Sequence, residues 1–136
     1  MFTHLKKRVY LCLIFSTLLV GCAGSDVSVS GKVSYGDQPV DRGVIEFIEV
    51  NNGPSFSDVI TEGHYKLQAA SGDYRVRITG IRAEHYEKPH KNRPDLPASG
   101  LIDVSYIPAV YNSETTLRAT VSPKESVHDF NLEAVK

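Results

Sequence analysis

The sequence contains no tryptophan, one methionine and two cysteines among its 136 residues. It has neither an HExxH nor a CxxC pattern, two common short signals of a zinc centre. The formal net charge is −1, which does not supply the basic surface that nucleic-acid phosphates require. No segment has the apolar spacing of an amphipathic helix of useful length. From these absences we expect no metal, no cofactor and no nucleic-acid partner, and a fold built from short strands.

The longest apolar run lies near the N-terminus and is too short to cross a membrane as a helix. It covers residues 9–20, whereas a spanning helix needs about 20 residues. Three basic residues, Lys6, Lys7 and Arg8, come directly before it. A basic stretch followed by an apolar run of this length is typical of a secretory signal peptide. We therefore interpret residues 1–21 as a signal peptide, whose removal would change the net charge from −1 to −4.

The end of this segment is Leu19-Val20-Gly21-Cys22, which resembles the bacterial lipobox. The resemblance implies that Cys22 becomes the first residue of the mature chain and carries a diacylglycerol, with two or more acyl chains giving a stable anchor. Ala23 follows Cys22 where an aspartate could stand, which resembles the pattern of outer-membrane sorting in a host with two membranes. The alternative is an ordinary signal peptide with a chance cysteine near its end.

The remaining chain is predicted to be one domain, residues 27–136, behind a tether at residues 22–26. Because Cys12 would be removed with the signal peptide, no disulfide can form within the mature chain. From Val27 onward, apolar and polar residues alternate with a period of two, which predicts strands with one buried face. We expect strands at residues 27–35, 44–50, 56–61, 65–69, 74–78, 117–121 and 128–132.

Two of these strands, 65–69 and 74–78, are separated by a short connection and predict a β-hairpin. Clustered cations on its exposed face could hold an anionic partner, such as an envelope polymer that carries phosphate or carboxylate groups. An ordinary solvated strand face is the alternative. The basic residues that would share this face are His64, Lys66, Arg75 and Arg77.

Residues 83–100 contain three prolines and many charges, and we expect a long loop without regular structure. Tyr86, Tyr106 and Tyr111 lie in or just after this loop and could form an aromatic platform for a sugar. Partial burial of the tyrosines beside Ile107 and Pro108 is the alternative.

Two further sets of residues could support chemistry, and each has a simpler explanation. Structural zinc sites need four fixed ligands, and a nucleophilic serine needs a base and an oxyanion loop around it. Solvated loop and strand residues therefore explain both sets better. The candidate metal set is Glu84, His85, Glu87 and His90, and the candidate nucleophilic set is Ser57, Asp58 and His64.

Several segments of the predicted domain combine turn glycines with alternating core residues, namely Gly31–Tyr35, Gln38–Val40, Gly43–Phe47, Thr61–Leu67, Gly72–Val76 and Ile107–Asn112. These segments resemble the carboxypeptidase regulatory-like domain and a small bacterial lipoprotein family built on it. The resemblance implies an all-β fold, an antiparallel seven-stranded prealbumin-like (transthyretin-like, Ig-like) β-sandwich, and an accessory module without a catalytic domain. Val110 departs from the basic residue expected at that position, which puts any ligand contact made there in doubt.

Together, these patterns predict a non-catalytic, lipid-anchored module of the cell envelope that faces the periplasm or the exterior. Its expected partners are the membrane, through Cys22, and an unidentified envelope protein or polymer. The alternative is a protein that binds a glycan or small ligand through residues 83–112.

Overall fold

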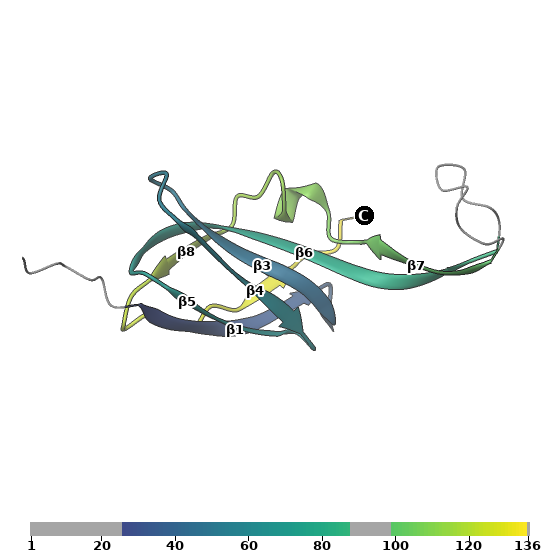
Figure 1. Cartoon of the computed structure of the whole chain (residues 1–136), viewed down its shortest axis with the longest axis horizontal. Helices are drawn as coiled ribbons and strands as arrows, with labels where there is room; N and C mark the ends of the chain where they lie inside the picture. The colour runs from purple at the N-terminus through teal and green to yellow at the C-terminus, as the bar shows by residue number, and fades with distance from the viewer. Residues whose placement is uncertain (1–25, 88–98, 136) are drawn as a thin grey trace, which may run out of the picture.

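The computed structural model describes residues 26–87 and 99–135, and these residues form an all-β structure (Figure 1). The one helical element among them is a short 3-10 turn, and no described helix is long and apolar enough to cross a membrane. The elements in chain order are β1 (Val27–Tyr35), β2 (Gln38–Pro39), β3 (Arg42–Glu49), β4 (Ser55–Thr61), β5 (His64–Ala69), β6 (Gly72–Tyr86), β7 (Gly100–Ser105), η1 (Ala109–Tyr111), β8 (Arg118–Val121) and β9 (Phe130–Leu132).

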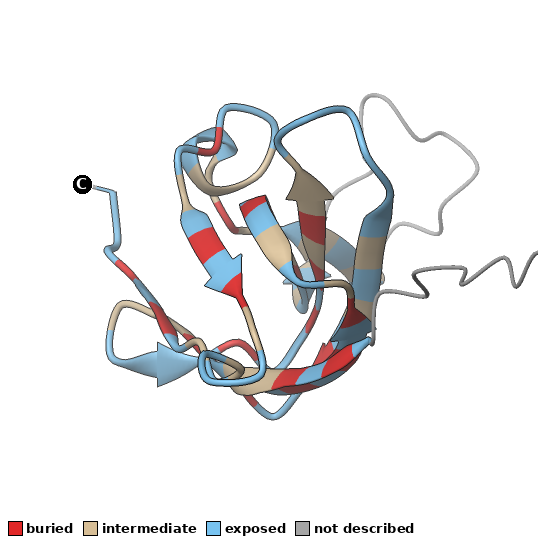
Figure 2. Cartoon of the chain, turned by 90° about the vertical axis from the view of Figure 1, so that its left-hand side faces the viewer, coloured by how far each residue is buried: buried red, intermediate tan, exposed pale blue. Residues whose placement is uncertain are grey.

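The strands form one curled sheet in the order β2-β1-β5-β4-β3-β6-β7, while β8 pairs with β6 and β9 pairs with β1. All the strand pairs are antiparallel except β1 with β9. Figure 2 shows buried and exposed residues alternating along strands that curve around the interior. The sheet therefore encloses a single core, and the expectation of an all-β fold is confirmed.

The core forms because the strands of the curl turn alternate residues, most of them apolar, to the inside. Ile45 and Phe47 of β3 and Val76 and Ile78 of β6 are fully buried. Strand β3 lies between β4 and β6, so both of its edges are paired within the sheet. The predicted strands are confirmed, with shifts of one or two residues at several ends, except that β6 continues eight residues past the predicted end at residue 78.

The sheet curls at the turn between β4 and β5. Glu62 and Gly63 both have positive φ, 51° and 77°, as the tight turn of a two-residue hairpin requires. Only Thr61 and His64 pair across this hairpin, and the strands then separate. On the side facing β4, the backbone N–H of Lys66 donates to the Asp58 carboxylate at 2.9 Å and not to a backbone carbonyl of β4. This separation allows β5 to turn toward β1 and close the core.

The predicted hairpin between residues 65–69 and 74–78 is wrong. Both segments are strands, but β5 pairs with β1 and β4, whereas β6 pairs with β3, β7 and β8. Each strand buries its own apolar face in the same core, Tyr65 and Leu67 from β5 and Tyr74 and Val76 from β6. Alternation fixes which face is buried but not which strand is the neighbour, so both arrangements satisfy the same pattern.

The prediction of an irregular loop over residues 83–100 is also wrong at its two ends. Strand β6 continues to Tyr86 and pairs with β7, and these two strands form an arm that extends beyond the curled sheet (Figure 1). An ion pair of 2.5 Å between Arg42 and Asp103 ties this arm to the start of β3. The three prolines of the segment lie outside the described residues.

Gly31 allows the C-terminal segment to pack against β1. A Cβ atom at this position would overlap the carbonyl oxygen of His128. The same close approach lets the His128 N–H donate to the Ser30 carbonyl at 2.9 Å. Any side chain at position 31 must therefore push β9 away from β1.

We expect Gly31→Ala to lower the free energy of unfolding by about 1–3 kcal/mol, the usual cost of overpacking. Urea unfolding followed by circular dichroism measures this change. Gly72→Ala is the matched control, because a Cβ there meets its nearest atom at an ordinary 3.7 Å. Equal effects of the two substitutions would contradict the close approach as the cause.

The Tyr65 hydroxyl makes the stability of the fold depend on pH in alkaline solution. It donates to the His128 carbonyl at 2.8 Å, and burial, followed by the Asp129 charge, raises its pKa above the ordinary 10.0. Above pH 10 the unfolded chain therefore loses this proton while the folded chain keeps it, so stability falls as the pH rises.

We expect Tyr65→Phe to be less stable than the wild type at pH 7 by about 0.5–1.5 kcal/mol, because the hydrogen bond is lost. The difference in free energy of unfolding between the two proteins should narrow between pH 10 and 11. The wild type loses stability there, whereas the variant has no hydroxyl to ionise at this site. Urea unfolding of both proteins from pH 7 to 11 measures the difference, and pH 7 to 8 is the internal control, where it should stay constant. A difference that grows above pH 10 would contradict the buried hydroxyl.

Candidate functional site

The candidate site lies on the side of β3, β6 and β8 that faces away from the core, here called the outer face. Strand register places Glu46 opposite Arg77, and Ile48 opposite Arg75. The pairing of β6 with β8 then places Arg75 opposite Arg118. The outer face consists of Val44, Glu46, Ile48, Arg75, Arg77, Thr79 and Arg118.

Loop residues after η1 form a hollow on this face, here called the central hollow, of about 280 Å³. Glu46 and Arg77 form an ion pair in it. The Asn112 side chain at its rim donates to the Ile107 carbonyl at 3.1 Å and accepts a hydrogen bond from the Ser113 N–H. The residues that line the central hollow are Val44, Glu46, Arg77, Thr79, Asn112 and Ser113.

A second hollow of about 470 Å³, here called the arginine hollow, lies between the β3–β4 turn and strands β6 and β8. The turn places Asn52 at a φ of 59°, a conformation that asparagine tolerates better than most residues. Two arginines enter the hollow from neighbouring strands. The residues that line it are Ile48, Glu49, Val50, Asn52, Gly53, Arg75 and Arg118.

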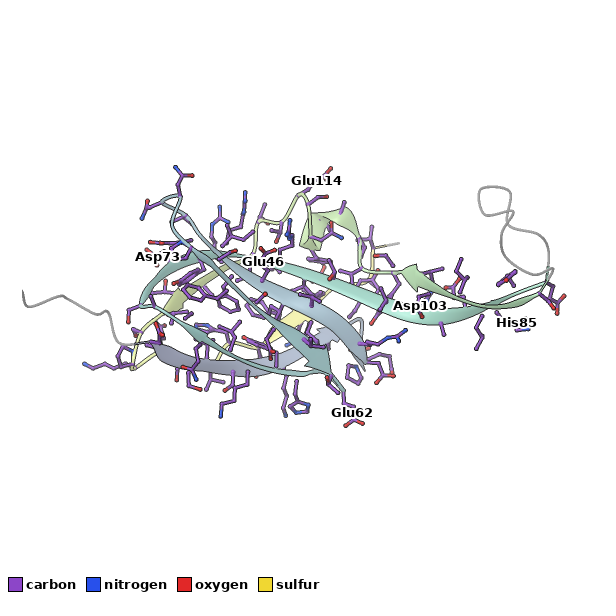
Figure 3. All side chains as sticks on the ribbon, viewed as in Figure 1. Glu46, Glu62, Asp73, His85, Asp103 and Glu114 are labelled. Atoms are coloured by element: carbon purple, nitrogen blue, oxygen red, sulfur yellow. The ribbon has the colours of Figure 1, made fainter. Side chains whose placement is uncertain are left out.

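The four cations expected on one hairpin face do not share a surface. Arg75 and Arg77 lie on the outer face, whereas His64 and Lys66 lie on β5, beside β1. In Figure 3, Glu46 and Asp73 lie on the side of the molecule that carries Glu114, and Glu62, which is adjacent to the β5 cations, lies on the opposite side. The basic residue that joins Arg75 is instead Arg118, which the sequence analysis did not single out.

The three tyrosines proposed for a sugar platform do not come together. Tyr86 pairs with Gly100 near the tip of the arm, five residues along the ladder from the pair Ile81–Ser105, or about 17 Å at ~3.4 Å per residue. The hydroxyl of Tyr111 donates to the Glu133 carbonyl at 3.1 Å and accepts from the Glu133 N–H at 3.0 Å. Tyr111 therefore holds the C-terminal segment.

Tyr106 is half-buried at the base of the arm. Its ring packs edge-on against Tyr35, with ring centroids 5.9 Å apart, and the Arg82 guanidinium lies 5.2 Å from its centroid. Burial raises the pKa of the Tyr106 hydroxyl, with Asp41 adding to this effect and Arg82 opposing it. These contacts give the tyrosine a packing role.

The residues considered for a metal or a nucleophile do not converge. Among residues 26–87 and 99–135, no group of three or more His, Cys, Asp or Glu side chains is placed to hold a metal ion, and His90 lies outside these ranges. Glu84 forms an ion pair with Arg82. The Asp58 carboxylate accepts the Lys66 N–H, and the Nδ1 atom of His64 lies 2.9 Å from the Glu62 carbonyl oxygen.

The lipobox residues Leu19, Val20, Gly21 and Cys22 lie outside the described residues. Compared with known proteins, the chain matches no protein-family model, no curated protein and no solved structure. A function for this chain is therefore inferred from two features. They are the geometry of the outer face and the position of the described domain after Cys22 in the sequence.

Thr115 fixes the loop that forms the central hollow. Its buried hydroxyl donates to the Val76 carbonyl at 2.7 Å and accepts from the Leu117 N–H at 3.2 Å. Removal of the hydroxyl leaves these two backbone groups without this partner in a place that water does not easily reach.

We expect Thr115→Val to lower the free energy of unfolding by about 1–3 kcal/mol, the cost of unsatisfied buried polar groups. The neighbouring Thr116 is exposed, so Thr116→Val serves as the control and should change stability by less than about 0.5 kcal/mol. Urea unfolding of the three proteins measures both changes. Similar losses for the two variants would show that the hydroxyl does not hold the loop.

Proposed function

We propose that this chain is a non-catalytic, lipid-anchored module of a bacterial cell envelope, and that its β-domain contacts an envelope protein or polymer. The proposal includes a signal peptide at residues 1–21, lipidation of Cys22 and a carboxypeptidase regulatory-like, prealbumin-like sandwich. The patterns that support it are the basic and apolar N-terminal segment, the lipobox resemblance and the all-β alternation from Val27 onward.

The structural observation that supports the proposal is the position of the start of β1 relative to the arm. Strand β1 begins at Val27, and the β6–β7 arm lies at the opposite end of the molecule's long axis (Figure 1). The stretch of chain from Cys22 to Val27 spans at most about 18 Å. A lipid on Cys22 would therefore hold the start of β1 near the membrane and direct the arm away from it.

The arm and the outer face offer surfaces for contact with a partner. Leu101 on the arm is 70% exposed, the most exposed large apolar side chain among the described residues, and it gives the arm an apolar contact for a partner surface. Binding of a glycan or small ligand, the second candidate function, has support from one feature, the polar rim that Asn112 and Ser113 give to the central hollow.

We expect the wild-type protein, expressed in a bacterial host, to fractionate with membranes, to begin at Cys22 and to carry the mass of a diacylglyceryl group. Cys22→Ala should lose the modification and the membrane association, because the thioether needs the thiol. Intact-mass spectrometry and membrane fractionation test this. Unmodified, soluble protein in both cases would overturn the anchored module.

Labelled proteoliposomes test the orientation. A fluorophore on Ser28→Cys, at the exposed side of the β1 start, should be quenched by a headgroup-attached quencher more strongly than one on Leu101→Cys. The reverse order, or equal quenching, would contradict an arm that points away from the membrane.

A further inference from the structure

Arg75 and Arg118 differ from the other arginines of the described chain in having no acidic partner. Arg42 pairs with Asp103, Arg77 with Glu46, and Arg82 with Glu84. Within the same described residues no ion pair is found for Arg75, and the hydrogen bond of the Arg118 side chain is a long one, 3.4 Å, to the Leu117 carbonyl.

The same two arginines are held next to each other by the sheet. They lie directly opposite in the β6–β8 ladder. Like charges in such positions destabilise a strand pair, and no carboxylate of the described chain relieves the repulsion by pairing with them. An anion bound between the two guanidinium groups would relieve it.

The carboxylates near the pair are engaged or directed elsewhere. Asp73, two residues from Arg75, accepts a hydrogen bond of 2.7 Å from the Thr120 hydroxyl. Glu49 lies in the arginine hollow, but its carboxylate occupies the space beside Gly53, where a Cβ would overlap a carboxylate oxygen. The hollow therefore presents donors from the arginines and a separate acceptor from Glu49.

The arginine hollow also lies at the end of the molecule where β1 begins. Strand β8 and Asp73 lie at that end in Figures 1 and 3. Burial raises the pKa of the Tyr74 hydroxyl, and the charges of Glu49 and Asp26 both add to this effect, so both acids lie within electrostatic reach of it. Asp26 is four residues after Cys22, so a lipid on Cys22 would bring the hollow close to the membrane surface.

We propose that the arginine hollow binds the headgroup of an anionic lipid, with a phosphate between Arg75 and Arg118 and a neighbouring hydroxyl on Glu49. Arginine presents planar forks of N–H donors that match phosphate oxygens. Glu49 repels a bare anion but accepts a hydrogen bond from a hydroxyl, so the hollow suits a phosphate next to hydroxyl groups, as in phosphatidylglycerol. The assignment to a lipid rests on the proposed anchor at Cys22.

The first experiment titrates the full chain in zwitterionic detergent micelles with sn-glycerol 3-phosphate, and follows arginine side-chain signals by NMR. We expect Arg75→Gln and Arg118→Gln each to weaken binding at least about tenfold, because a charge-assisted contact is lost. Arg42→Gln, which removes the same charge at the base of the arm, is the matched control and should bind as the wild type does. Near-ultraviolet circular dichroism checks that each variant is folded.

Two more variants separate recognition from folding and from net charge. Arg75→Lys keeps the charge but loses the fork, and should bind more weakly than the wild type and more tightly than Arg75→Gln. Glu49→Ala, which removes both the charge and the acceptor, should bind inorganic phosphate more tightly than the wild type does, and should lose the preference for glycerol 3-phosphate over inorganic phosphate. Equal affinities across all variants, or equal losses in Arg42→Gln and Arg75→Gln, would overturn the site.

The second experiment identifies the source of the phosphate. A fluorophore on Asn51→Cys, in the turn beside the hollow, is quenched from the headgroups of phosphatidylcholine vesicles prepared with or without phosphatidylglycerol. We expect phosphatidylglycerol to increase quenching in the wild type and in Arg42→Gln, but not in Arg75→Gln. If quenching does not change and a glucuronate oligosaccharide binds instead, the lipid assignment is wrong and the partner is an anionic polymer.

The proposed function and this site can fail separately. A soluble, unmodified wild-type chain that still binds glycerol 3-phosphate through Arg75 and Arg118 would overturn the anchor and the lipid assignment, and leave the phosphate site. A lipidated chain with no arginine-dependent binding would overturn the site alone.

Discussion

Aromatic packing around Phe47 holds the curled sheet closed. The β4–β5 hairpin contributes one paired position, Thr61 with His64, so backbone hydrogen bonds there hold the two sides of the curl together weakly. Phe47 on β3 makes up for this, because its ring meets rings from β5, β6 and the C-terminal segment. Its neighbours are Tyr65, Tyr74, His128 and Phe130, with ring centroids 5.8–6.4 Å apart within this cluster.

The closed core determines what the outer face presents. Once Phe47 and Val76 are fixed opposite each other inside, the residues on either side of them are fixed opposite each other outside. Glu46 then meets Arg77, and Ile48 meets Arg75. The positions of the charged side chains follow from packing on the other side of the sheet, since a shift of one residue would reverse every side chain of the strand.

Local alternation made much of the strand content predictable, and it failed where pairing depends on distant residues. Strand β1 could be assigned to its own residues because Val27, Val29 and Val33 share one face. The neighbour of β5 could not be assigned, because its apolar face fits a core against β6 or beside β1 equally well. Strands β6 and β7 continue into a segment whose prolines and charges suggested a loop, and ladder pairing overrides that local composition.

The candidate site was predictable only in part for the same reason. The exposure of Arg75 and Arg77 follows from the period of β6 alone, and both are on the outer face. Their different surroundings do not follow from that period. Glu46 lies opposite Arg77 and Arg118 lies opposite Arg75 through two separate strand pairings between residues distant in the sequence. Glu49 and the β3–β4 turn complete the arginine hollow only when the register of all three strands is known.

The opposed arginines connect stability with the proposed role of the surface. A sheet that keeps two unneutralised cations side by side gives up some stability, while an acid in place of either one would remove the repulsion. A ligand that binds the folded chain between them and not the unfolded chain adds stability in proportion to the logarithm of its concentration relative to its Kd. The fold would therefore be most stable where such anions are abundant, as they are at a membrane surface rich in anionic lipid. In the proposed arrangement, an anchor at Cys22 and the arginine hollow would act at the same end of the molecule, and the arm and the central hollow would stay free for the proposed envelope partner.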